Sequence, residues 1–154
     1  MSDLLDALRL PLRAGVAAGL AYWAAASLAL GNPIYALVSA VVVTDVSSAQ
    51  TRKLVLPRIV GTFIGAGFGC IAALLVPANP LTVIGGVAVP MFACVLLRIP
   101  AAAKVAGFVS GIILVGFAAN PLAHALDRII ETLLGIAAAT AVSLVPLLLP
   151  PKDQ

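Results

Sequence analysis

The chain contains the stretch PRIVGTFIG at residues 57–65 and a similar stretch, DRIIETLLG, at residues 127–135. Each has an arginine in second place, followed by an apolar segment with threonine and glycine at the same steps. The identical pairs, all seventy residues apart, are Arg58 and Arg128, Ile59 and Ile129, Thr62 and Thr132, and Gly65 and Gly135. Weaker matches at nearly the same offset include VSAVVV (38–43) and VSGIIL (109–114). The pattern indicates an internal repeat; chance similarity between two helices of like composition is the alternative.

The composition indicates a membrane protein. The chain is 62% apolar and 10% charged, with a mean hydropathy of +1.17, whereas soluble domains are about 45–50% apolar and about 25% charged. The apolar runs are continuous and rich in Ala, Leu and Gly, without the alternation of a barrel strand. We therefore expect an all-α integral membrane protein, in which lipid surrounds the apolar helices.

Turn signals divide the apolar sequence into segments of helix length. The breaks are GNP (31–33), the polar run DVSSAQTRK (45–53), PANP (77–80), RIPAAAK (98–104) and NP (120–121). The six predicted transmembrane helices span residues 14–30, 33–50, 56–77, 80–98, 103–119 and 122–149, after an amphipathic lead-in, SDLLDALRLPLR, at the membrane interface. Residues 1–154 thus form one transmembrane domain of two repeats, about 12–77 and about 80–149. Because each repeat has three helices, an odd number, the second copy must be inverted in the membrane.

The basic residues predict the orientation of the helices. With the N-terminus in the cytoplasm, the inner side holds eight of the nine basic residues: Arg9, Arg13, Arg52, Lys53, Arg58, Arg98, Lys104 and Lys152. The outer side holds only Arg128. This asymmetry follows the positive-inside rule and predicts that both termini are cytoplasmic. Arg58 then opens its helix at the cytoplasmic end, and Arg128 lies near the outer end of the last helix.

The two arginines are candidate anion-binding residues. Both lie near predicted helix N-termini, where the helix dipole favours anions, and a planar guanidinium can hold a carboxylate with two hydrogen bonds. Thr62 and Thr132 follow one turn later on the same helix faces. We expect Arg58, Thr62, Arg128 and Thr132 to line a substrate pathway, with Tyr35 at the outer interface. The alternative for Arg58 is a topology anchor whose charge reaches the lipid headgroups.

Asp45 is a candidate for proton coupling. It lies about twelve residues into the predicted helix 33–50, within the cytoplasmic half of the span. An ionisable group at such a depth suggests a functional site. The alternative is a structural ion pair with Arg52, Lys53 or Arg58.

A second charged cluster begins the last predicted helix. His124, Asp127, Arg128 and Glu131 follow one another at helical spacings. We expect a solvated helix end joined by ion pairs. In the alternative, Glu131, the deepest of the four, lines the outer mouth as a proton acceptor or as a tether for Arg128. One histidine and two carboxylates make a weak metal-ligand set, so we expect no metal.

No residues in the sequence predict catalysis. The chain has one histidine and no phosphate-binding glycine loop, and neither cysteine lies near a base. We expect no enzyme activity, no cofactor and no nucleic-acid partner, since the basic residues act as topology determinants. Gly61, Gly65 and Gly69 follow one another at four-residue spacing, which lets another helix approach closely in lipid.

The segment NPIYALVSAVVVTD…QTRKLVLPRIVGTFIGAGFG, residues 32–69, resembles the signature of the FUSC, or aromatic acid exporter, superfamily. The matching positions are Pro33, Tyr35, Thr51, Lys53, Arg58, Gly61 and Thr62. The resemblance implies passage of organic, including aromatic, carboxylate anions across a bacterial inner membrane. Typical members are several times longer, so we expect this six-helix unit to form a homodimer or a higher homo-oligomer.

Two hypotheses of different class follow. The first is an organic-anion transporter or channel, exporting its substrate, with an arginine at each mouth of the pathway. The second is a membrane scaffold or assembly subunit without a pathway, whose charges only set its topology. A cation transporter would need several buried carboxylates, and the sequence offers only Asp45 and Glu131.

Overall fold

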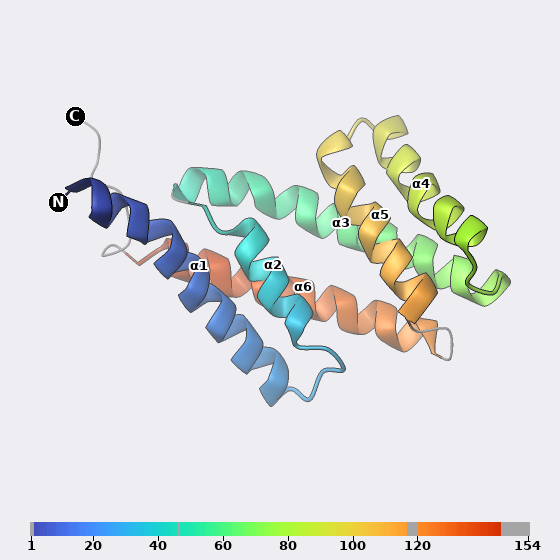
Figure 1. The fold of residues 1–154 in the computed structure, drawn as a ribbon, viewed down its shortest axis with the longest axis horizontal. Coiled ribbons are helices and arrows are strands. Elements are labelled where there is room, and N and C mark those ends of the chain that lie inside the picture. Colours follow the sequence, from blue (N-terminus) through green and yellow to red (C-terminus); the bar gives the residue numbers. More distant parts are fainter. Residues whose placement is uncertain (1, 46, 117–119, 146–154) are drawn as a thin grey trace. The chain divides into compact units, whose positions relative to one another are not determined.

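A computed structural model of the chain describes residues 2–45, 47–116 and 120–145. It contains six helices, labelled in Figure 1: α1 (Ser2–Ser27), α2 (Ile34–Val43), α3 (Ser48–Leu75), α4 (Pro80–Leu96), α5 (Pro100–Gly116) and α6 (Pro121–Ser143). These described ranges hold no strand, and the all-helical prediction is confirmed. One helix, over Ala49–Leu75, is both long enough and apolar enough to cross a membrane, whereas Ile34–Val43, Pro80–Leu96 and Pro100–Gly116 are apolar but shorter.

The connection between α2 and α3 departs from the predicted helices. Helix α2 ends at Val43, because Thr44 takes an extended conformation (φ −71°, ψ 130°). Helix α3 starts at Ser48, eight residues before the predicted start. The polar run was predicted to break the helices, but Ala, Gln, Arg and Lys are good helix formers wherever their side chains can reach solvent. Only a short connection remains, in which the Asp45 N–H donates to Thr51 Oγ1 at 3.1 Å.

Helix starts elsewhere follow the turn signals of the sequence. Asn79 caps α4: its side chain accepts hydrogen bonds from the backbone N–H groups of Leu81 and Thr82, and Thr82 Oγ1 accepts from the Asn79 N–H at 2.9 Å. This reciprocal pair is a capping box. At the N-terminus, the predicted lead-in is not separate, because α1 runs from Ser2 through Pro11 to Ser27.

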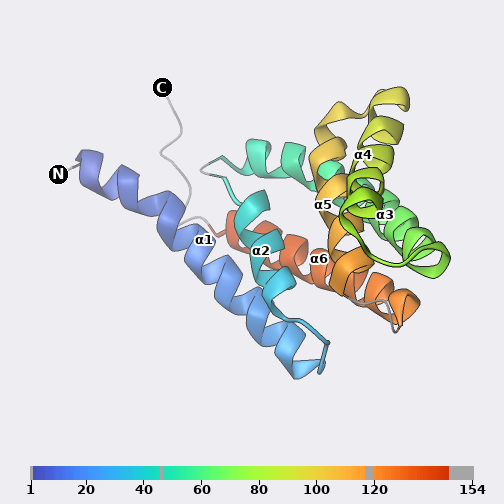
Figure 2. The same cartoon turned by 45° about the vertical axis from the view of Figure 1, so that its right-hand side comes forward.

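The described residues form two compact units, each considered by itself. The first unit holds α1, α2, the start of α3 and the part of α6 from Glu131 onward; the second, residues 57–130, holds α4, α5, most of α3 and the first part of α6. Within the second unit α4 lies beside α5, and within the first α1 lies beside α2, as both Figure 1 and Figure 2 show. Ser110 Oγ of α5 donates to the Gly86 carbonyl of α4 at 2.6 Å.

Glycines of α3 bring it against α5 in the second unit. A Cβ added at Gly61, Gly65 or Gly69 would meet the backbone of Ala102, Ala106 or Ser110, respectively. The three contacts advance by four residues on both helices, so the two backbones touch over two full turns. Only glycine allows this approach, because any side chain on this face of α3 would hold the helices apart.

The first unit contains the same kind of glycine contact. Its glycine, Gly135, lies seventy residues after Gly65, and its partner, Ala36, lies seventy residues before Ala106. A Cβ added at Gly135 of α6 would meet the carbonyl of Ala36 on α2, just as one at Gly65 would meet the carbonyl of Ala106 on α5. Each unit therefore joins a helix pair from one half of the chain to a glycine-bearing helix from the other half. The two contacts are thus related by the same offset of seventy residues as the matched sequence positions.

Candidate functional site

Arg58 lies well inside α3. The prediction that it opens its helix is wrong, because α3 begins ten residues earlier, at Ser48. At 1.5 Å per residue, Arg58 is about 15 Å along the helix. Its side chain is only 4% exposed. A charged group this deep in an apolar helix is costly to bury and is a candidate for function.

Two residues of the second unit surround Arg58 closely. The Arg58 Cζ atom lies over the ring of Phe108 on α5, 5.0 Å from its centroid. Thr62, also buried, donates its hydroxyl hydrogen to the Arg58 backbone carbonyl at 2.8 Å. Because this bond uses the only hydrogen of the hydroxyl, Thr62 is poorly suited to donate to an anion in this conformation.

Arg128, on α6, belongs to the same unit as Arg58 and is equally buried, at 4% exposed. It lies close enough for its positive charge to act on the Arg58 guanidinium. The second unit therefore brings the repeated arginines into one electrostatic neighbourhood. Like charges in one unit repel each other.

Glu131 is fully buried on α6, in the first unit. One of its carboxylate oxygens accepts a hydrogen bond from the backbone N–H of Asn32, in the α1–α2 connection, at 3.0 Å. Thr132 beside it is also buried. A solvated helix end is therefore the wrong interpretation of this cluster; only His124 and Asp127 are partly exposed.

Asp45 lies outside any helix. The prediction that it stands twelve residues into the second helix is wrong, because α2 ends at Val43. Its charge acts on Arg13 of α1, which is completely buried in the first unit. Of the predicted partners, Arg52 and Lys53 are exposed on α3. Sequence reasoning missed Arg13 as a partner, since the arginine was assigned to the cytoplasmic border; its place next to the continuous apolar run from Ala14 was the available signal.

Tyr35 lies in the first turn of α2 and is half-buried. Its backbone N–H donates to the Asn32 carbonyl at 3.1 Å. Asn32 in the α1–α2 connection therefore makes both contacts: its carbonyl accepts from the Tyr35 N–H, and its own N–H donates to the Glu131 carboxylate. Both contacts lie within the first unit.

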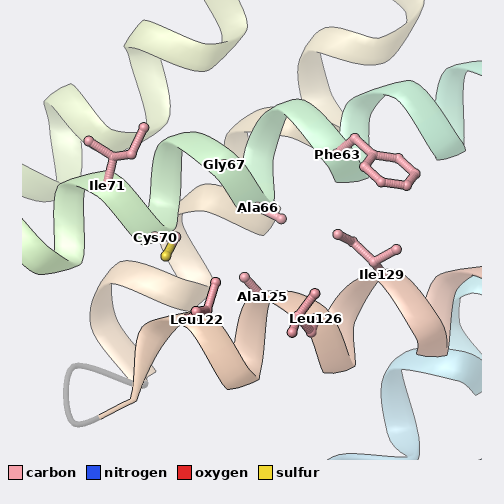
Figure 3. Close-up of a pocket in the computed structure, with 9 residues that line it drawn as sticks. All are labelled: Phe63, Ala66, Gly67, Cys70, Ile71, Leu122, Ala125, Leu126 and Ile129. Atoms are coloured by element: carbon pink, nitrogen blue, oxygen red, sulfur yellow. The ribbon is translucent and has the colours of Figure 1, made fainter.

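An apolar pocket of about 360 Å³ opens within the second unit, between α3 and α6 (Figure 3). Its lining is Phe63, Ala66, Gly67, Cys70, Ile71, Leu122, Ala125, Leu126 and Ile129. None of these lining residues is charged. The pocket therefore lacks the donors that a carboxylate needs. Among the residues that the structure describes, no three His, Cys, Asp or Glu side chains form a group that could hold a metal ion.

Comparison with known families agrees with the sequence resemblance. The family model described as fusaric acid resistance protein-like (FUSC_2) matches residues 20–142. No curated protein and no solved structure matches the chain. Because the family match covers most of the sequence, the chain belongs to the fusaric acid resistance protein-like family. This membership supports a membrane protein with a function of the transport or resistance type, rather than an enzyme.

Proposed function

We propose that this member of the fusaric acid resistance protein-like family exports organic carboxylate anions, including aromatic ones, across a bacterial inner membrane. The observation that carries the proposal is the burial of Arg58 and Arg128 in one compact unit, each only 4% exposed and near enough to interact. A planar guanidinium can hold a carboxylate with two hydrogen bonds, and two such groups in one unit suit the binding of an organic anion.

The two arginines then act as two anion-binding points of one pathway. We place Arg58 inside the pathway and not at its mouth, because α3 begins ten residues before Arg58. Thr62, Thr132 and Tyr35 are assigned to the wall of the pathway. The two threonines are buried and follow the arginines by one helical turn, so they narrow the space next to each charge.

The proposal includes an inverted repeat of three helices and a homodimer or higher homo-oligomer. The matched contacts of Gly65 with Ala106 and of Gly135 with Ala36 support the repeat. With three helices per copy, alternate crossing of the membrane inverts the second copy and leaves both termini cytoplasmic. A second subunit would complete the enclosure of a pathway that one small six-helix chain encloses poorly.

Glu131 is the preferred candidate for coupling transport to protons. It is a fully buried carboxyl group on the same helix as Arg128, and one of its oxygens accepts a hydrogen bond from the Asn32 N–H. Asp45 is better suited to a structural ion pair, because it lies in a connection and attracts the buried Arg13.

Benzoate flux in proteoliposomes tests the proposal. We expect the variants Arg58→Ala and Arg128→Ala to lower flux by about ten- to hundredfold, the equivalent of a lost charge-assisted hydrogen bond. The lysine variants should recover part of the flux, because an ammonium keeps the charge but lacks the planar fork. Arg52→Ala is the matched control, since Arg52 is exposed on the same helix as Arg58.

The rival function is a scaffold or assembly subunit, with exposed apolar faces that bind lipid or other membrane proteins. Under that function, vesicles with the native protein pass no more benzoate than empty vesicles, and the arginine variants change nothing. Such a result would overturn the transport proposal.

A further inference from the structure

We propose that Phe108 is a positioning residue that holds the Arg58 guanidinium in place and sets its affinity for carboxylates. The inference rests on the proposed anion transport and names a residue that neither the sequence repeat nor the family match assigns. The juxtaposition that carries it is the ring of Phe108 on α5 against the cationic centre of Arg58 on α3, within the second unit.

The geometry fits a cation–π interaction. The Arg58 Cζ atom lies over the ring, 5.0 Å from its centroid, within the limit of about 6 Å at which such contacts are attractive. Phe108 is 37% exposed, whereas Arg58 is 4% exposed. The ring thus covers the arginine and keeps it from the surroundings of the unit. The contacts of Gly61 and Gly65 with α5 fix the spacing of the two helices, and therefore the height of the ring above the guanidinium.

An aromatic ring suits this task better than an acidic side chain. A carboxylate partner would hold Arg58 through the N–H groups at the edge of the guanidinium plane, which are the groups that grip a substrate carboxylate. A ring stabilises the charge through its face and uses none of these N–H groups. Phe108 therefore contacts the face of the Arg58 guanidinium and does not compete with a carboxylate for its N–H groups.

The ring also distinguishes the two arginines of the repeat. The residue seventy positions before Phe108 is Val38 on α2, which has no aromatic ring. The aromatic support is therefore a property of the second unit and not of the repeat as such. We infer that substitutions of Phe108 act through Arg58 and leave the contribution of Arg128 unchanged.

The test measures initial flux against substrate concentration in proteoliposomes, with benzoate and cyclohexanecarboxylate as probes. We expect Phe108→Leu to raise the KM for both probes by about threefold to thirtyfold, the range of cation–π energies from exposed to desolvated sites, with little change in maximal rate. Phe108→Tyr keeps the ring and should stay within about twofold of the native KM. Phe108→Met is a second variant without a ring, in case the leucine variant does not fold.

The matched control is Phe68→Leu on α3. This substitution also removes an aromatic ring, and Phe68 is 38% exposed, close to the exposure of Phe108. In an Arg58→Ala background, Phe108→Leu should have no further effect on KM. A shift for benzoate alone would overturn the inference, because it would mean that Phe108 contacts the substrate's ring.

The two proposals fail in different ways. If flux depends on Arg58 but is indifferent to the Phe108 variants, the positioning role is wrong and anion transport stands. If flux does not depend on Arg58, the transport proposal fails and the role of Phe108 fails with it.

Discussion

Replacing Gly65 by alanine tests the close packing of α3 against α5. An added Cβ would lie 2.9 Å from both the Cα of Ala106 and the Cβ of Val109, whereas ordinary contacts begin at 3.4 Å. It would also meet the carbonyl oxygen of Ala106. Two of these three atoms belong to the backbone, so no side-chain rotation can relieve the overlap. The helices must move apart by about 0.5 Å or more.

The expected cost follows from this separation. A gap of about 0.5–1 Å forfeits a quarter to a half of the attraction between facing atoms, and an extra carbon in a packed interior costs about 1–3 kcal/mol. Gly67, on the same helix, has nothing within 4 Å of an added Cβ. Gly67→Ala should therefore be neutral or stabilising by up to about 1 kcal/mol, because alanine favours the helix. We expect the two alanine variants to differ by about 1–4 kcal/mol in unfolding free energy.

The assay is unfolding by SDS in mixed micelles, followed by far-ultraviolet circular dichroism. Gly65→Ala should unfold at a lower SDS fraction than the native protein, and Gly67→Ala at the same or a higher one. Gly135→Ala should behave like Gly65→Ala, since its Cβ would lie 2.6 Å from Ser39 Cβ and 2.8 Å from the Ala40 nitrogen. Equal stabilities of the Gly65 and Gly67 variants would refute the packing argument.

Two further predictions use the same titration. Glu131→Leu removes the acceptor of the Asn32 N–H and should lower the unfolding free energy by about 1–3 kcal/mol. Glu131→Gln keeps an acceptor oxygen and should lower it by less. Equal losses in the two variants would contradict the role of that oxygen. Ser110→Ala removes the 2.6 Å bond to the Gly86 carbonyl and should cost about 0.5–1.5 kcal/mol. Ser27→Ala is its control, because the Ser27 hydroxyl bonds within an exposed part of its own helix; an equal cost there would mean that the contact between α4 and α5 adds nothing.

Helix number and type were predictable because they depend on local signals. Continuous apolar runs require helices in lipid, and Pro, Gly and Asn mark the ends. The cap at Asn79 is an example, since its hydrogen bonds involve only residues within three positions. The same local approach failed at residues 48–53, where polar side chains were taken for a break although they favour a helix.

The candidate site was predictable only in part. The repeat singled out Arg58 and Arg128, because an arginine is conspicuous in an apolar sequence. Their burial, and the ring of Phe108 over Arg58, depend on which helices pack together, and no local pattern reports that. The electrostatic effect of Asp45 on Arg13 was missed for the same reason, because Arg13 lies within α1 and Asp45 lies in the connection after α2.

By itself, the amino-acid sequence determined an all-helical, strongly apolar chain, a repeated arginine–threonine–glycine step and a resemblance to a transport family, because composition and motifs are properties of the chain alone. Only the tertiary structure decided that α3 packs against α5 and α6 against α2, so that each half of the chain completes the other. The reason is physical: in lipid, helices associate through close backbone contact at small residues. Packing, and not hydrophobicity, therefore determines which helix lies against the glycines of α3 and of α6.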